Sequence, residues 1–473
     1  MSYACLEHLE PQAFFRWFGA IAAIPHGSGK EEKLIAFLQR FAAERTLECT
    51  TDKAGNVLIR VPAYPGYETQ SAILFQAHMD MIWACAEGVS FDFAGSALEL
   101  YVEGDLLRAR GTTLGADNAV GMATMLALAD DDTIPHPPLE LLFTVCEEAG
   151  MVGIRAVDPQ TIHARRMINM DCGDSHVLCV CSAGKNDTGI DHVFPLQPAA
   201  SQAYTVTISG GLGGHPGLSA NQGRCCCANA MGQLLSGLAE LRLCALEGSQ
   251  AIMTKATAVI TADEDPTAQL QTRFALIRQV YAQTDPGLQL TVKACPCPET
   301  GLGREDSHRV AQCLLQMPSG QLRCDGNDPR NIVSSGTVTG LSLENGAFRL
   351  RYRLRSTIAA DSILQFERLA AAMAALGLTL RSLDSYEGWT EKQTSPFRDK
   401  FLRIHRALFG EDMELERCSG GIETGILTHK LPDMDAIGIA PTARGAHTPD
   451  EHLFISQVQP YWQLLLAVLA EKE

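Results

Sequence analysis

The sequence has no apolar run long enough to form a transmembrane helix, which takes about 20 consecutive residues. Its opening residues, MSYACLEHLEPQ, contain acidic side chains in place of the basic start of a signal peptide. We therefore expect no membrane partner and a cytoplasmic location.

Positive charge is scarce in this chain. Its 38 Lys and Arg residues are outnumbered by 55 Asp and Glu residues, which gives a formal net charge of -17. A surface this acidic argues against nucleic acid or an anionic membrane as the main partner. The same excess of carboxylates is compatible with a site that binds cations.

The chain also lacks any C-x-x-C pair, although it has 16 cysteines. Three of them, Cys225–Cys227, are consecutive, an arrangement in which mutual disulfides are geometrically awkward. Reduced and mostly buried thiols in a cytosol are the simpler interpretation.

Strands and helices alternate in the first part of the chain. The segments GNVLIRV, SAILFQAHMD, LELLFTVCEEAG and RMINMDCGD have the apolar character of buried strands, and NAVGMATMLALADD has that of a helix. Alternation of this kind predicts an α/β fold, with helices on both faces of a mixed sheet.

The pattern changes after about residue 186. Segments such as AYTVTISGG and FRLRYRLRST alternate apolar and polar residues, as half-exposed strands do, and helices are expected over 221–244, 266–283, 304–316 and 361–376. We therefore expect a discontinuous α/β domain, residues 1–186 and 391–473, with an inserted α+β domain over 187–390. The sequence leaves open whether the insert consists of two similar halves.

Polar residues gather where the predicted strands end. In open α/β sheets, ligands bind beyond the carboxyl ends of the strands. A glycine-bounded turn, GTTLGADNAVG, and a late loop, RGAHTPDE, add two further candidates. The candidates from all of these places are His78, Asp80, Asp117, Glu147, Glu148, Asp171 and His447.

Taken singly, each of these residues is more often a helix cap, a turn residue or a core hydrogen-bonding group. Together they would bring at least five carboxylates into one crevice, where protons or cations must offset their repulsion. Two divalent ions bridged by one carboxylate would do so, and mixed His, Asp and Glu ligation is typical of zinc. The side chains of adjacent Glu147 and Glu148 diverge, so one can bind metal while the other stays free as a base.

The motifs AHMDMI, GADNAVG, EEAG, NMDCGD and RGAHTPDE resemble those of aminoacyl-histidine dipeptidases. These enzymes belong to a di-zinc metallopeptidase group that includes peptidase T and acetylornithine deacetylase. The resemblance runs over nearly the whole chain and implies a catalytic domain of the zinc-exopeptidase type with an inserted lid domain.

The resemblance also implies a set of metal ligands. Asp117 would bridge two divalent ions, His78 and Asp171 would complete one site, and Glu148 and His447 would complete the other. Zinc is the expected metal, with cobalt or manganese as alternatives.

Two further residues acquire catalytic roles from the resemblance. Asp80 would orient His78, and Glu147 would act first as general base and then as general acid. A water bridging the two ions would attack the scissile amide.

The insert resembles the lid of the same family. His215, in SGGLGGHPG, would polarise the substrate carbonyl as a catalytic residue, and Arg355, in RLRST, would bind the substrate carboxylate. The loop CSGGIETG would contribute Gly420, Gly421 and Glu423 to substrate binding.

Three positions depart from the family pattern. Thr257, which we expect to contact substrate, stands where the family has an asparagine. Ser419 replaces a histidine, and Pro216 removes a hydroxyl and an N–H donor. All three lie where substrate preference would be set, so hydrolysis is more secure than a preference for histidine.

We therefore predict a hydrolase that cleaves small dipeptides, either X-His dipeptides or a broad range. An N-acyl-amino-acid deacylase of the same fold is the alternative, because the same water attack cleaves any small amide. A non-catalytic metal-binding regulator is a more remote one. A homodimer is an open possibility for the assembly.

Overall fold

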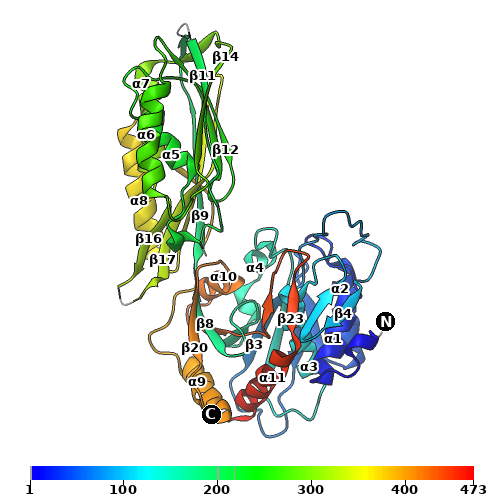
Figure 1. Ribbon diagram of the computed structural model, residues 1–473. Coiled ribbons are helices and arrows are strands. Elements are labelled where there is room, and N and C mark those ends of the chain that lie inside the picture. The colour runs from blue at the N-terminus through cyan, green and yellow to red at the C-terminus, as the bar shows by residue number, and fades with distance from the viewer. Residues whose placement is uncertain (1–2, 200–201, 218, 327, 473) are drawn as a thin grey trace. The chain divides into compact units, whose positions relative to one another are not determined.

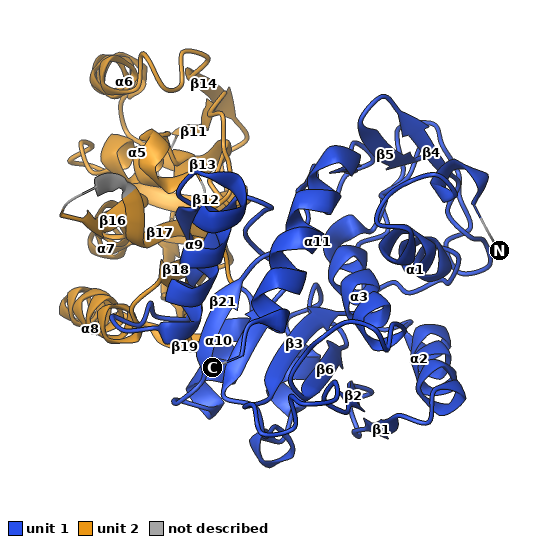
Figure 2. Cartoon of the chain, turned by 90° about the horizontal axis from the view of Figure 1, so that it is seen from below, with its two compact units in different colours: residues 1–181, 389–418, 422–473 blue, residues 182–388, 419–421 orange. Residues whose placement is uncertain are grey.

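The computed structural model describes residues 3–199, 202–217, 219–326 and 328–472 (Figure 1). These residues form two compact units (Figure 2). Unit 1 comprises residues 1–181, 389–418 and 422–473, and unit 2 comprises residues 182–388 and 419–421. The boundary expected after residue 186 falls inside strand β9 (Gly184–Val193), because this strand crosses the change of composition on which that boundary was based.

Unit 1 is built on an eight-stranded mixed sheet in the order β1-β2-β6-β3-β7-β21-β8-β20. Its four central strands, β6, β3, β7 and β21, run parallel. The strands are β1 (Glu48–Thr51), β2 (Val57–Val61), β3 (Ile73–His78), β6 (Leu139–Thr144), β7 (Arg166–Asn169), β8 (Val177–Ser182), β20 (Glu414–Cys418) and β21 (Asp435–Gly438). Every residue of β3 and β6 is buried, as expected when both faces of a sheet are covered.

Among the described residues of unit 1, seven α-helices accompany this sheet. They are α1 (Gln12–Ala22), α2 (Glu32–Glu44), α3 (Ala116–Ala129), α4 (Val152–Ala156), α9 (Pro396–Phe409), α10 (Glu423–Lys430) and α11 (Ile455–Ala470). A small second sheet has the order β22-β23-β5-β4 and consists of β22 (Ala443–Arg444), β23 (His452–Phe454), β5 (Leu106–Ala109) and β4 (Leu100–Glu103).

Unit 2 contains one continuous antiparallel sheet in the order β14-β11-β13-β12-β17-β18-β9-β19, with β16 (Gly320–Asp325) also paired to β17. Its other strands are β11 (Gln202–Ser209), β12 (Arg242–Ser249), β13 (Lys255–Ala262), β14 (Gln289–Cys295), β17 (Asp328–Glu344), β18 (Ala347–Ser356) and β19 (Arg381–Tyr386). The sequence left open whether the insert consists of two similar halves. In the structure, pairing of β12 with β17 makes its strands one sheet. A separate short pair is formed by β10 (Leu196–Pro198) and β15 (Thr300–Leu302).

Figure 1 shows the described α-helices of unit 2 on one side of its sheet. They are α5 (Cys227–Leu235), α6 (Thr267–Val280), α7 (Arg304–Gln316) and α8 (Ala359–Ala375). The helix expected over 221–244 is wrong at both ends, because α5 is shorter and residues 242–249 form β12. The consecutive cysteines Cys225–Cys227 are buried and free at the start of α5. Within the described residues, no helix is long and apolar enough to cross a membrane.

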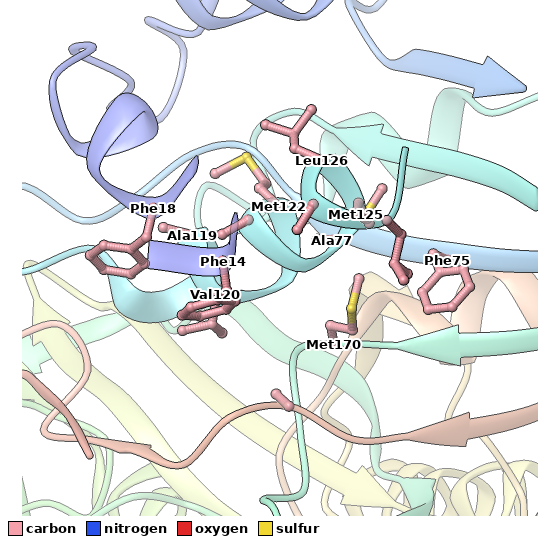
Figure 3. Close-up of a cluster of buried hydrophobic side chains, with 14 of the residues drawn as sticks. Phe14, Phe18, Phe75, Ala77, Ala119, Val120, Met122, Met125, Leu126 and Met170 are labelled. Carbon is pink, nitrogen blue, oxygen red and sulfur yellow. The ribbon is translucent and has the colours of Figure 1, made fainter. Parts of the chain in front are cut away.

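The core of unit 1 holds α3 tightly against the central sheet. Figure 3 shows side chains of α1, α3 and β3 in one apolar cluster, among them Phe14, Phe75 and Ala77. Gly121, within α3, permits this close approach: a Cβ placed there would lie 2.8 Å from the Cβ of Ala77 and 2.9 Å from the Cβ of Met170. The helix that begins beside Asp117 is thereby fixed to the strand that ends at His78.

We predict that Gly121→Ala destabilises unit 1 by about 1–3 kcal/mol, because neither contacting Cβ can move without moving backbone. Chemical denaturation would measure the loss. Gly326→Ala is the control, since a Cβ there meets nothing within 4 Å. Equal stability of the two variants would contradict the close-approach explanation.

Candidate metal centre

Three neighbouring parallel strands bring their ends to one edge of the sheet in unit 1. Strand β3 ends at His78, Glu147 and Glu148 follow β6, and Asp171 follows β7. These strands are adjacent in the order β6-β3-β7, so the groups that follow them converge. The predicted convergence is therefore a consequence of sheet order.

Two further groups reach this edge from elsewhere in unit 1. Asp117 opens α3 with dihedral angles that are not helical, next to a cis peptide bond to Asn118. His447 lies between β22 and β23 and has φ of 67°, in the left-handed region that few non-glycine residues adopt. A non-glycine residue in the left-handed region, such as His447, is a feature that clusters at functional sites.

Asp117 lies between two histidines. One of its oxygens, Oδ1, is 2.9 Å from Nε2 of His78, and the other, Oδ2, is 3.3 Å from Nε2 of His447. His78 Nε2 is also 3.6 Å from Oδ1 of Asp171, and His447 Nε2 is 2.5 Å from Oε1 of Glu148. The five side chains predicted as ligands thus form two His-carboxylate pairs that share Asp117.

The other ring nitrogen of His78, Nδ1, also has a polar partner. It lies 2.9 Å from the backbone carbonyl oxygen of Asp80 and 3.6 Å from a carboxylate oxygen of the same residue. Donation from Nδ1 to that carbonyl leaves Nε2, which faces Asp117, as the nitrogen that can bind a metal once it has lost its proton.

The Asp80 carboxylate has a further structural task. It accepts hydrogen bonds from Ser28 Oγ at 2.7 Å and from the backbone N–H groups of Glu147 at 2.9 Å and Glu148 at 3.2 Å. Burial would raise its pKa, but His78 and these hydrogen bonds hold the pKa below its normal value. Asp80 therefore fixes the loop that carries both glutamates, a function the sequence did not predict for it or for Ser28.

The cluster strongly perturbs the acidity of its carboxyl groups. Burial, with the nearby charge of Asp117, raises the pKa of Asp171 to about 7. Burial likewise raises the pKa of Glu147 well above its normal value. Burial would also raise the pKa of Asp117, but hydrogen bonds from His447 and His78 outweigh it and the pKa is lowered.

The two histidines respond in the opposite direction. Hydrogen bonds to Asp117 and Glu148 raise the pKa of His447 to about 10. For His78, burial favours the neutral ring, but neighbouring carboxylates raise its pKa well above the normal value. Protons therefore supply the positive charge that the carboxylates need, in the same positions where a cation would supply it.

The donor set fits divalent cations. Ligand atoms of His78, Asp117 and Glu148 all lie within 4.8 Å of one another. Imidazole nitrogens mixed with carboxylate oxygens suit zinc and also cobalt or manganese. Sharing of Asp117 between both pairs is the arrangement that a bridging ligand requires.

Glu451 is a residue of this site that the sequence analysis missed. Its buried carboxylate accepts hydrogen bonds from the N–H groups of Leu114 and Gly115, both at 2.8 Å, and of Asp117 at 3.1 Å. It thereby holds the turn that presents Asp117. The only available signal was its place at the end of the motif RGAHTPDE, which also carries His447.

The expectation that Glu423 contacts substrate is not supported by its position. Its side chain is 0% exposed, and Thr144 and Gln76 donate hydrogen bonds to it. The glycines before it belong to unit 2, where Gly420 accepts a hydrogen bond at 2.8 Å from the N–H of Ala183. Glu423 instead opens α10 in unit 1.

The other candidate substrate contacts lie in unit 2. Arg355, on β18, is 8% exposed, and its Nε and Nη1 have no hydrogen-bond partner among the described residues. Partial burial and the positive charges of Arg355 and Arg353 lower the pKa of His215 to about 4. Thr257, on β13, places its hydroxyl 3.3 Å from that of Thr207.

Glycines let the His215 loop pack closely within unit 2. A Cβ on Gly217 would lie 2.3 Å from the carbonyl oxygen of Ser419 and 3.4 Å from Cδ of Arg355. The N–H of Gly217 also donates to Nδ1 of His215 at 3.2 Å. His215, Arg355 and the 419–421 segment are therefore neighbours.

Comparison with known proteins identifies the family. Residues 74–471 match the profile of Peptidase family M20/M25/M40, so the chain belongs to this family. It is 29% identical to the cytosol non-specific dipeptidase of Escherichia coli (strain K12), over 98% of this chain and 99% of that protein. The chain is a hydrolase, and the predicted family resemblance is confirmed.

Solved structures agree on the fold. The aminoacylhistidine dipeptidase from Vibrio alginolyticus superposes with a TM-score of 0.89 and 26% identity, covering 99% of this chain and 98% of that one. Aminopeptidase PepT from Bacillus cereus superposes with a TM-score of 0.62 over 98% of each chain, and at 14% identity it shows the fold alone. The predicted α/β fold with an inserted domain is confirmed.

We predict that divalent cations stabilise unit 1, because they replace the repulsion of buried carboxylates with attraction. A cation at a hundred times its Kd would contribute about 2.7 kcal/mol. Thermal unfolding with zinc, cobalt or manganese, and with a chelator, would measure the shift in Tm. In Asp117→Asn the cation-dependent shift should be much smaller, and an unchanged Tm in the native chain would contradict a metal site.

Proposed function

We propose that this chain is a dipeptidase that uses two divalent cations, with zinc as the first candidate. The observation that carries the proposal is the position of Asp117, shared between the His78 pair and the His447 pair. One cation would be held by His78, Asp117 and Asp171, and the other by Asp117, Glu148 and His447. When bound, such ions lower the pKa of water and polarise a carbonyl group.

Glu147 is the proposed general base. It follows β6 beside the ligand Glu148, and Asp80 anchors its backbone N–H. Its raised pKa suits a carboxyl group that takes a proton from the attacking water and later gives it to the leaving amine. The two roles fall to adjacent residues because their side chains diverge.

His215 is proposed to polarise the substrate carbonyl. With a pKa of about 4 it is neutral at physiological pH. Its Nδ1 accepts the N–H of Gly217, so the ring proton resides on Nε2, which can donate a hydrogen bond to a carbonyl oxygen. A neutral donor stabilises a developing oxyanion without competing for the cations.

Arg355 is the proposed binding group for the substrate carboxylate. A buried guanidinium whose Nε and Nη1 have no hydrogen-bond partner among the described residues is costly unless a ligand supplies one. A carboxylate can accept from it in a two-pronged arrangement. Thr257, Gly420 and Gly421 remain proposed substrate contacts in unit 2.

The two units correspond, in this proposal, to a catalytic domain and a lid domain. We take the dipeptide range as broad, with X-His dipeptides included, because a relative similar over its whole length is a non-specific dipeptidase. A cytoplasmic location and a homodimer complete the proposal. No observation favours an N-acyl deacylase, and the presence of Glu147 argues against a non-catalytic regulator.

A substrate panel would test this function. We expect the metal-loaded chain to hydrolyse several dipeptides, including X-His, faster than N-acetyl amino acids. Glu147→Gln should lower kcat by about a hundredfold to ten-thousandfold, since a general base contributes that much. Metal content, measured by elemental analysis, should not change. Faster cleavage of N-acetyl amino acids would favour the deacylase, and an active Glu147→Gln variant would remove its role as base.

Recognition of the carboxylate can be tested separately. Removing a charge-assisted hydrogen-bonding group, as in Arg355→Ala, should lower kcat/KM for a dipeptide by about tenfold to a hundredfold. The matched substrate is the same dipeptide with an amidated C-terminus, on which the variant and the native chain should act alike. An equal loss on both substrates would show that Arg355 serves the fold.

A further inference from the structure

A row of hydrogen-bonded polar side chains lies in the interior of unit 1, next to the candidate metal centre. Gln76 on β3 and Asn169 on β7 precede His78 and Asp171 by two positions, and Thr144 ends β6. All three side chains are 0% exposed. Each is therefore buried at the end of a strand that leads into the site.

Glu423 joins this row from α10. Thr144 Oγ1 donates to its Oε2 at 2.5 Å, and Gln76 Nε2 donates to the same oxygen. Asn169 Nδ2 in turn donates to Gln76 Oε1 at 2.6 Å, and Asn169 Oδ1 accepts the backbone N–H of Asp171 at 3.1 Å. A continuous chain of hydrogen bonds thus runs from Glu423 to a proposed metal ligand.

The environment of Glu423 is unusual for a carboxyl group. Its side chain is completely buried, and its Oε1 has no hydrogen-bond partner among the described residues. Burial raises its pKa to about 8, so the group retains a proton at neutral pH. Because Oε2 accepts two hydrogen bonds, that proton belongs on Oε1.

A buried carboxyl with a purely structural role is available for comparison in the same sheet. Glu140, at the other end of β6, accepts the N–H groups of His163 and Ala164, both at 3.0 Å from its Oε2, and lies 3.3 Å from the guanidinium of Arg60. Glu140 thus has backbone donors and an ion pair. Within the described part of the chain Glu423 has neither, and its donors are side chains on two strands that carry site residues.

We propose that Glu423 is a positioning residue for the metal centre, acting as a neutral hydrogen-bond acceptor that fixes the ends of β3, β6 and β7 relative to one another. This inference rests on the proposed function, because it concerns the same site. Among the described residues, an apolar residue at this position would leave Thr144 Oγ1 with only the carbonyl oxygen of Ala77, at 3.4 Å, as an acceptor, and Gln76 Nε2 with only Thr144 Oγ1, at 3.2 Å. Loss of the shorter bonds to Glu423 explains why an apolar residue would not serve.

The test compares metal affinity with stability in three variants. In Glu423→Ala, the affinity for zinc, measured by competition with a chromogenic chelator, should fall by about tenfold to a hundredfold, as for other groups that orient metal ligands. Glu423→Gln keeps the acceptor and places an NH₂ group where the carboxyl has its proton. It should retain the native affinity.

Glu140→Ala is the matched control. It also removes a buried acceptor from the sheet and should lower Tm, but its zinc affinity should equal that of the native chain. If Glu423→Ala lowers Tm while zinc affinity is unchanged, the positioning role is refuted. It is equally refuted if Glu423→Gln loses as much affinity as Glu423→Ala.

Thr144→Val, in which the new side chain has nearly the shape of the old one, provides a second test if Glu423→Ala does not fold. Thr144→Val removes one of the two donors to Glu423 and should lower zinc affinity in the same direction, while an unchanged affinity would refute the proposal. The same assays on the native chain distinguish a failure of this inference from a failure of the proposed function. Suppose that the native chain binds zinc and cleaves dipeptides, but the variants do not show the expected changes in zinc affinity. That result counts against the role of Glu423 alone.

Discussion

The repulsion among carboxylates at one edge of the unit 1 sheet is the constraint on which the site depends. Three adjacent parallel strands and one helix start bring Asp117, Glu147, Glu148 and Asp171 together. In the absence of cations, protonated histidines and raised carboxyl pKa values must balance this charge. Each of those protons stands where a divalent cation would be more effective, so the charge imbalance is itself the driving force for metal binding.

Such a site needs rigid support, because carboxylates that repel one another would otherwise move apart. The support consists largely of other carboxylates that accept backbone N–H groups. Asp80 accepts those of Glu147 and Glu148, and Glu451 accepts that of Asp117. Acceptors of this kind fix the backbone on which a ligand is carried and leave the ligand's own oxygens free.

The convergence of the five proposed ligands could be predicted from the sequence more readily than the residues that support them. His78, Asp117 and Asp171 stand at strand ends or in a glycine-bounded turn, where local pattern is informative. The partners of Glu451 are more than 330 positions away, and no local pattern connects such segments. Glu423 was predicted as a substrate contact together with its glycine-rich neighbours, but those glycines belong to unit 2 and its own side chain is buried in unit 1. The expected helix over 221–244 failed because its apolar content fits a half-buried strand equally well.

The two units contain buried groups of opposite charge. The cluster in unit 1 has an excess of negative charge and favours cations. Arg355 in unit 2 is a buried cation whose Nε and Nη1 have no hydrogen-bond partner among the described residues, so it favours an anion. A small peptide with a free carboxylate carries a group of each complementary kind, since an amide carbonyl is a ligand for cations and a carboxylate is a ligand for a guanidinium. An amide within a long chain offers the carbonyl without the nearby carboxylate. Charge complementarity thus favours small substrates with a free carboxylate close to the scissile amide. The neutral state of His215 fits the same logic, because a neutral ring can donate a hydrogen bond without adding charge.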